Sequence, residues 1–204
     1  MRRSAAFLAL ILVFAAEASA KKRGLVADTS PNACEGGSYS VVGSPDGTTL
    51  SILFDNFSLT GGSQRGIERI SCSMQIPLSL PEGYSLGVYR VDYRGFAHLQ
   101  PRQHSVLSVD YTLGFRNKNR RHRGRIDGAY DGDFVFSERI GAGFMKRVGC
   151  GEAAVLNVAA ALELRTRGEP GEAMVTLDSL DGAAQGALVY RFDYKRCGKN
   201  RDAQ

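Results

Sequence analysis

Apolar and polar residues alternate along three segments of the chain. Every second residue is apolar in the segments 70–80, 107–115 and 188–194. Because successive side chains of a strand point to opposite faces, each segment predicts a β-strand with one buried face. Pro77 lies at an outward position of the first segment. Since proline has no N–H to donate, it indicates an edge strand or a bulge.

The segment 153–165, AAVLNVAAALELR, has a mixed pattern. Its alanine, leucine and glutamate residues favour a helix. Its even-numbered residues from 156 to 164 are all apolar, however, and this is the period of a strand. We therefore predict a strand in this segment.

Turn signals separate the alternating segments at short intervals. They include PDG at 45–47, PEG at 81–83, GEPG at 168–171 and the DG pairs at 127–128 and 131–132. Many short strands joined by such turns predict an all-β fold, a single antiparallel β-sandwich over residues 34–197. The polar segments 21–33 and 198–204 flank this domain, and we expect both to be flexible.

The N-terminal residues have the pattern of a secretory signal peptide. Arg2 and Arg3 precede an apolar run over residues 5–16, and the small residues ASA follow at 18–20. The run is shorter than the roughly 20 apolar residues of a membrane-spanning helix. We expect cleavage after Ala20 and a secreted, periplasmic or extracellular protein.

Four cysteines follow the leader: Cys34, Cys72, Cys150 and Cys197. An even number of cysteines in an exported chain favours two disulfides, and their wide spacing does not suit a structural zinc site. Three pairings are open. If the first and last strands lie antiparallel and side by side, Cys34 pairs with Cys197 and Cys72 pairs with Cys150. We take this pairing as the expectation.

The positive charge of the chain is concentrated in one stretch. The net charge is +5, and removal of the leader leaves about +4. The stretch 115–125, FRNKNRRHRGR, has no acidic residue, and we interpret it as the exposed connection of a β-hairpin. Its cationic residues are Arg116, Lys118, Arg120, Arg121, Arg123 and Arg125.

Two functions of this basic stretch are open. It can be a solvated loop that keeps the protein soluble. It can also bind a polyanion, and for an exported protein the partners we expect are anionic lipid headgroups, acidic polysaccharide or extracellular DNA. No aromatic side chain is interleaved with the charges to stack on bases, so such binding would be electrostatic.

The sequence shows no recognisable catalytic motif. It has three histidines and lacks the H-E-x-x-H and G-x-S-x-G patterns, so we favour a non-catalytic exported protein without a cofactor. The alternative is a hydrolase of glycans or esters that uses Asp127, Asp131 and Asp133. The same aspartates could bind calcium. The interpretation that we favour is structural, because Asp-Gly pairs make turns.

Two further motifs have alternative interpretations. In DYRGF, at 92–96, Tyr93 and Phe96 could stack on a sugar or a base, but aromatic residues in strands more often cover the core. We expect the core position, with Asp92 and Arg94 exposed. Asn56 begins an N-F-S sequence, which is a glycosylation acceptor if the organism uses a eukaryotic secretory route.

The order of several segments is similar to that of a known family. Between Cys34 and Cys197 come SPDGTTLSILFDNF (44–57), CSMQIPLSLPEGY (72–84), VDYRGFAHL (91–99), GAYDGDF (128–134) and CGEAAVLNV (150–158). This series resembles the exported family catalogued as domain of unknown function 4360. The resemblance implies a secreted β-rich domain with two disulfides and no assigned activity. The chain departs from the family in its basic segment, where relatives tend to have Ser and Thr, and in lacking a tryptophan near the last cysteine.

Overall fold

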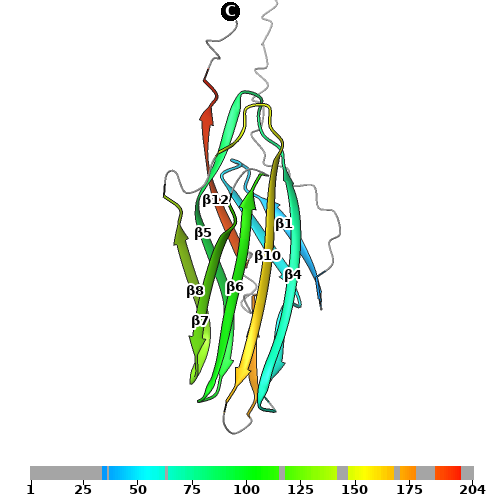
Figure 1. The fold of residues 1–204 in the computed structure, drawn as a ribbon, viewed down its shortest axis with the longest axis vertical. Helices are drawn as coiled ribbons and strands as arrows, with labels where there is room; N and C mark the ends of the chain where they lie inside the picture. Colours follow the sequence, from blue (N-terminus) through cyan, green and yellow to red (C-terminus); the bar gives the residue numbers. More distant parts are fainter. Residues whose placement is uncertain are drawn as a thin grey trace, which may run out of the picture.

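Two antiparallel sheets pack face to face in the computed structural model of the protein (Figure 1). The structure describes residues 34–35, 37–62, 64–114, 118–141, 147–167, 171–177 and 187–198. Within these ranges the chain forms strands and no helix, and hence no helix that could span a membrane. The all-β antiparallel sandwich predicted from the sequence is confirmed. The expected signal peptide, the segment 21–33 and the tail after residue 198 lie outside the described residues.

The smaller sheet has four strands in the order β4-β10-β6-β7. Their bounds are Gly66–Leu78 (β4), Ala154–Thr166 (β10), Gln103–Leu113 (β6) and Arg120–Asp127 (β7). The segment with the mixed pattern is β10, so the prediction of a strand there is confirmed. β4, which contains Pro77, lies at one edge of the sheet, a position that tolerates proline.

The larger sheet is built around one long strand. Its order is β1-β2-β12-β5-β11-β3, and β8 and β9 also pair with β5. The bounds are Ser38–Gly43 (β1), Thr49–Asp55 (β2), Leu188–Arg196 (β12), Tyr84–Leu99 (β5), Ala173–Thr176 (β11), Ser58–Gly61 (β3), Tyr130–Arg139 (β8) and Val148–Gly149 (β9). Asn56, which begins the N-F-S sequence, is exposed at the turn between β2 and β3.

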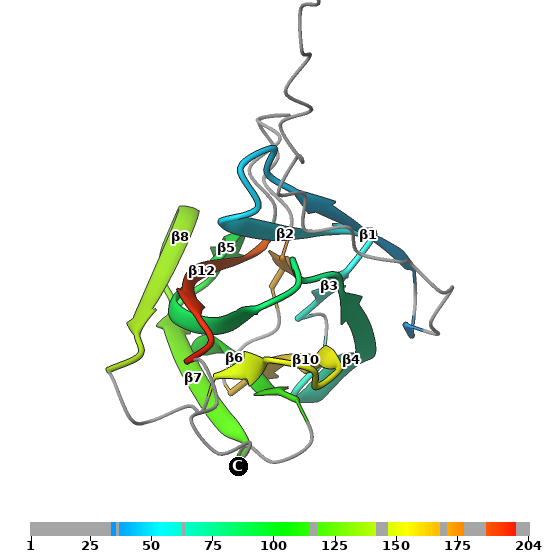
Figure 2. The ribbon, with the colours of Figure 1, turned by 90° about the horizontal axis from the view of Figure 1, so that it is seen from above.

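The hydrophobic core fills the space between the sheets. Seen from above in Figure 2, β8, β5, β12, β2 and β1 form one layer, and β7, β6, β10 and β4 form the other. Ile52 of β2, Leu107 of β6, Leu162 of β10 and Tyr190 of β12 are fully buried between them. Each large apolar side chain buried in this way stabilises the fold by about 1.5–3 kcal/mol. Burial of one face of every strand therefore fixes which residues point outward.

Most of the basic segment forms a strand, so the prediction of an exposed loop is wrong. Residues 115–117, which include Arg116, lie outside the described residues, and the strand β7 begins at Arg120. β7 pairs antiparallel with β6, with Arg123 opposite Ser108. Its inward residues include Gly124, where a Cβ atom would come within 2.4 Å of the Phe136 ring. Because a glycine and a histidine occupy inward positions, the period of two is hard to see in the sequence.

The two disulfides differ from the expected pairing. Cys34 is bonded to Cys72, and Cys150 is bonded to Cys197. The expectation required β1 and β12 to lie antiparallel and side by side. In the structure β2 lies between them and is antiparallel to both, so β1 and β12 run parallel. The start of β1 and the end of β12 are therefore at opposite ends of the sheet, and Cys34 meets Cys72 on β4 instead.

Peptide mapping without reductant is expected to recover the linked pairs Cys34–Cys72 and Cys150–Cys197. The two bonds join residues 38 and 47 apart in the sequence. Loop-closure entropy predicts that each bond stabilises the fold by about 4 kcal/mol, so replacing either pair by alanine should lower the free energy of unfolding by that order. Recovery of a Cys34–Cys197 peptide would contradict the topology.

Candidate functional site

A groove runs along the outward face of the four-stranded sheet. Its floor consists of small residues, Ala159 and Ala161 of β10 with Ser73 of β4 and Ser108 of β6. Two hollows of about 250 and 450 Å³ lie over this floor, and Asp110 lines both of them. We call them together the sheet-face groove.

Longer side chains form the walls of the groove. On the β4 side these are Arg69 and Gln75, and on the β7 side they are Asn119, Arg121 and Arg123. The lining of β10 extends from Asn157 to Glu163, six residue steps of a strand, which is about 20 Å. The groove is thus long enough for an extended ligand.

The register of the strands produces this shape. Ala161 lies directly between Ser71 of β4 and Ser108 of β6, while Glu163 lies between Arg69 and Val106. Small side chains therefore meet small side chains at the centre of the sheet. The arginines of β7 and β4 stand at its two edges, so the middle of the face is lower than its sides.

Most of the charged groups of the groove are paired. Arg121 donates from Nε to Asp110 Oδ1 at 2.8 Å, and the Asn119 amide donates to the same oxygen at 3.0 Å. The Asp110 hydrogen bond raises the pKa of Arg121. Arg165 donates to Glu163. Among the described residues, Arg69 and Arg123 are the two guanidinium groups of the groove without an ion pair or a hydrogen bond to protein.

The six residues of the predicted polyanion site do not act together in the structure. Arg120 points inward and donates to Glu138 at 2.6 Å. Arg125 is paired with Asp127, also at 2.6 Å. Lys118 is exposed before β7, and Arg116 lies outside the described residues. Arg121 and Arg123 remain in the groove, and Arg69, which the sequence analysis did not consider, joins them from β4.

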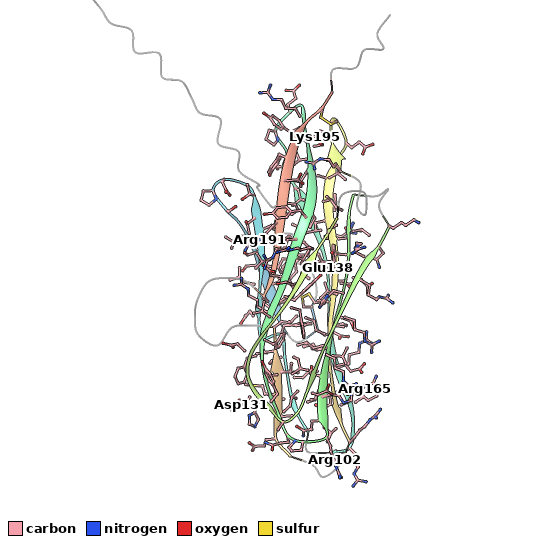
Figure 3. All side chains as sticks on the ribbon, turned by 90° about the vertical axis from the view of Figure 1, so that its left-hand side faces the viewer. Arg102, Asp131, Glu138, Arg165, Arg191 and Lys195 are labelled. Carbon is pink, nitrogen blue, oxygen red and sulfur yellow. A yellow bond between two sulfur atoms is a disulfide. The ribbon has the colours of Figure 1, made fainter. Side chains whose placement is uncertain are left out.

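The three aspartates of the predicted cluster lie on different faces. Asp127 is on the outward face of the four-stranded sheet, opposite His104 of β6. Asp131 and Asp133 are on the outward face of the other sheet, where Asp131 lies 3.2 Å from His98 Nδ1. Figure 3 shows Asp131 and Arg165 on opposite sides of the molecule. Within the described residues, no three His, Cys, Asp or Glu side chains are placed to hold a metal ion together.

A buried polar cluster that the sequence analysis missed lies between the sheets, beside β7 and β8. Glu138 Oε2 accepts hydrogen bonds from the hydroxyls of Tyr93 and Tyr111, both at 3.1 Å, and Oε1 accepts from Arg120. Burial raises the pKa of both tyrosines, so their hydroxyls remain protonated and donate. Both oxygens of the Glu138 carboxylate thus accept hydrogen bonds from the protein, and the residue has a structural role.

His122 belongs to the same region of the core. Its ring stacks on that of Tyr93, with ring centroids 4.0 Å apart, and its Nε2 is buried without a hydrogen-bond partner. Burial lowers the pKa of His122 below its ordinary value. The histidine is therefore a neutral packing residue.

Tyr93 of DYRGF is in the core, as expected, but Phe96 lies outside the core, Arg94 is half-buried and Asp92 is not exposed. Tyr93 is fully buried, and Asp92 is 1% exposed. Asp92 Oδ1 accepts from Ser137 Oγ at 2.6 Å and from Arg90 Nε at 2.8 Å. Burial alone would raise the pKa of Asp92, but these hydrogen bonds and the nearby arginines hold it below its ordinary value. The expectation of an exposed Asp92 is wrong because Arg90 and Ser137 lie over it.

Comparison with known proteins identifies the family. The family model described as Domain of unknown function (DUF4360) matches residues 26–197. The chain belongs to this family. The resemblance noted in the sequence is thereby confirmed, and the family's description names no activity.

Two individual proteins are also similar to this DUF4360 member. An uncharacterized secreted protein of Arthroderma benhamiae is 23% identical over 150 residues, which are 72% of this chain and 61% of the relative. The chain thus spans less than two thirds of that relative. The structure of TmCBM61 in complex with β-1,4-galactotriose has a TM-score of 0.28 and 14% identity, covering 72% of this chain and 70% of that one.

The substitution Glu138→Ala is expected to lower the free energy of unfolding by about 2–4 kcal/mol. It leaves Arg120 and two buried hydroxyls without their acceptor, and the side chains of Arg120 and Glu138 are only 27% and 17% exposed. Asp127→Ala is the matched control, because it removes the exposed partner of Arg125 and should barely change the urea midpoint. Equal effects of the two substitutions would contradict a structural role of the cluster.

The pKa of His122 predicts a loss of stability on mild acidification. Because burial lowers this pKa in the folded state, the unfolded chain takes up the proton first as the pH falls below about 6.5. The free energy of unfolding should therefore decrease from pH 7 to pH 5. The substitution His122→Phe keeps the stacked ring, and it breaks no hydrogen bond of Nε2 because this atom has no partner. Since phenylalanine does not titrate, the urea midpoint of this variant should fall less over this pH range. Parallel pH profiles for the two proteins would refute this assignment.

Proposed function

We propose that the protein is an exported, non-catalytic module that binds a linear polysaccharide through the sheet-face groove. The observation that carries the proposal is the lining of the groove, which places hydroxyl, amide, carboxylate and guanidinium groups along about 20 Å of open sheet. Sugar hydroxyls both donate and accept hydrogen bonds, so a wall of mixed donors and acceptors suits them. The floor of alanine and serine leaves room for a sugar ring.

The polar lining also sets the kind of binding that we expect. No aromatic residue is among the described residues that line the two hollows. Affinity would therefore come from hydrogen bonds and ion pairs rather than from stacking of rings on an aromatic side chain. Such contacts exchange with water and contribute little each, so useful affinity requires several sugar residues along the groove.

The arrangement of carboxylates supports binding rather than hydrolysis. The groove contains Asp110 and Glu163, and each is bound by an arginine. Asp110 lies opposite Ala159, four residues before Glu163 on β10, so the two are about 14 Å apart along the strand direction. The carboxyl groups of glycosidases are roughly 5–9.5 Å apart. The alternative that uses Asp127, Asp131 and Asp133 has no support, because these residues lie on opposite faces.

Export is part of the proposal. The leader with its expected cleavage after Ala20, the two disulfides and the secreted relative in Arthroderma benhamiae support it. A purely electrostatic contact with lipid headgroups or DNA has less support. The sequence suggests this contact because six cations lie close together in one segment. In the structure, however, three of the four arginines of β7 are paired with carboxylates.

Affinity electrophoresis tests the proposal. The protein is recovered from culture medium, and after cleavage of the leader it should begin at Lys21. Gels containing neutral or acidic polysaccharides should retard the wild type in at least one case. Ala159→Phe fills the exposed floor of the groove and should weaken that retention at least tenfold. Val135→Phe is the matched control, because Val135 is 59% exposed on the other sheet, and it should bind like the wild type.

Three results would overturn the proposal. The first is a wild type that no polysaccharide retards. The second is Ala159→Phe binding as well as the wild type, with circular dichroism confirming that both are folded. The third is binding to anionic vesicles or DNA in the absence of any polysaccharide binding, which would favour a non-specific electrostatic contact.

A further inference from the structure

We propose that Arg69 and Arg123 form a subsite for a single carboxylate, so that the sheet-face groove selects polysaccharides that contain uronic acid. This inference rests on the proposed function and adds the substrate class to it.

Arg69 and Arg123 approach the same part of the groove from opposite walls. Arg69 lies on β4 and Arg123 on β7, with β10 and β6 between them. Three strand spacings and a register offset of two residues separate their backbones by about 16 Å. Both arginines line the hollow whose floor is Ser108 and Ala161. Long side chains on opposite walls can therefore reach the same bound group over this floor.

The other charges of this hollow already have partners within the protein. Asp110 binds Arg121, and Glu163 binds Arg165. Arg69 is directly opposite Glu163 on the neighbouring strand, yet Glu163 is held by Arg165, its neighbour two residues along β10. Two cations thus remain for a ligand. Guanidinium groups bind carboxylates through paired, charge-assisted hydrogen bonds, which are shorter and stronger than neutral ones.

The carboxylates of the groove favour a ligand with separated charges. Asp110 and Glu163 line the same hollow as the two arginines. A dense polyanion would place like charges against them; duplex DNA, for example, carries one charge per 1.7 Å or so. A polyuronate carries one carboxylate per sugar ring, with neutral hydroxyls between the charges. Such a chain can place its carboxylate between the arginines and its hydroxyls beside Asp110 and Glu163.

Titration calorimetry with polygalacturonate and its fully methyl-esterified form tests the subsite. The ester keeps the sugar hydroxyls and the chain but removes the charge. At physiological salt the wild type should bind the acid at least tenfold more tightly than the ester. Arg69→Gln and Arg123→Gln should each reduce this ratio, and the double substitution should abolish it. Arg139→Gln is the matched control, because it removes one exposed charge on β8 of the other sheet.

The outcomes separate this inference from the proposed function. If the acid and the ester bind equally and Ala159→Phe weakens both, the groove binds polysaccharide and the carboxylate subsite is wrong. If the protein binds neither the acid nor the ester, and no other polysaccharide, then both the proposed function and the carboxylate subsite are wrong. If Arg139→Gln lowers the ratio as much as Arg69→Gln, the preference reflects overall charge. Tighter binding of DNA than of polygalacturonate would also overturn the subsite.

Discussion

The register of β10 between β4 and β6 determines both faces of the smaller sheet. Its even-numbered residues, such as Leu156 and Leu162, are buried in the core, so its odd-numbered residues must face solvent. Those residues include Ala159 and Ala161, which form the floor of the groove. A shift of one residue would place alanine in the core and leucine on the surface. The packing of the core therefore fixes the shape of the candidate site.

Charged residues occupy the interior where the two sheets meet at β7 and β8. Glu138 accepts hydrogen bonds there from Arg120 and from two tyrosines, and the stacked ring of His122 fills the adjacent space. Such a network is costly when one member is missing and close to neutral when it is complete. The network connects the two sheets through specific hydrogen bonds at this edge of the sandwich. It leaves Glu138 without the free carboxylate oxygen that a catalytic acid or base needs.

The two faces of the sandwich differ in how they use their charges. On the larger sheet, Asp92 is buried under Arg90 and Ser137, and Arg147 is bound to Asp193. On the smaller sheet, pairing along the walls leaves Arg69 and Arg123 over a floor of small residues. A binding function for the smaller sheet agrees with this difference, and the family assignment adds no activity to it.

The sequence by itself determined the fold class, the strands with strict alternation and the number of disulfides. Burial of one face of a strand produces alternation of apolar and polar residues, and this alternation is plain in β4, β6 and β12 and mixed in β10. The prediction from the sequence failed for β7, because its inward positions include Gly124, which faces Phe136, and His122, which packs on Tyr93. Those positions are shaped by contacts with β8 and β5 in the other sheet, which the pattern within β7 does not record.

Only the tertiary structure decided the disulfide pairing, the partners of the arginines and the groove itself. The order of strands in a sheet is not a local property, and the insertion of β2 between β1 and β12 is what separated Cys34 from Cys197. Asp110 and Glu163 form ion pairs with arginines, which the sequence does not reveal, and Arg69 contributes to the groove from β4, although it precedes the first residue of β7 by 51 positions. A binding site assembled across four strands depends on register, and register is settled by the packing of the whole core.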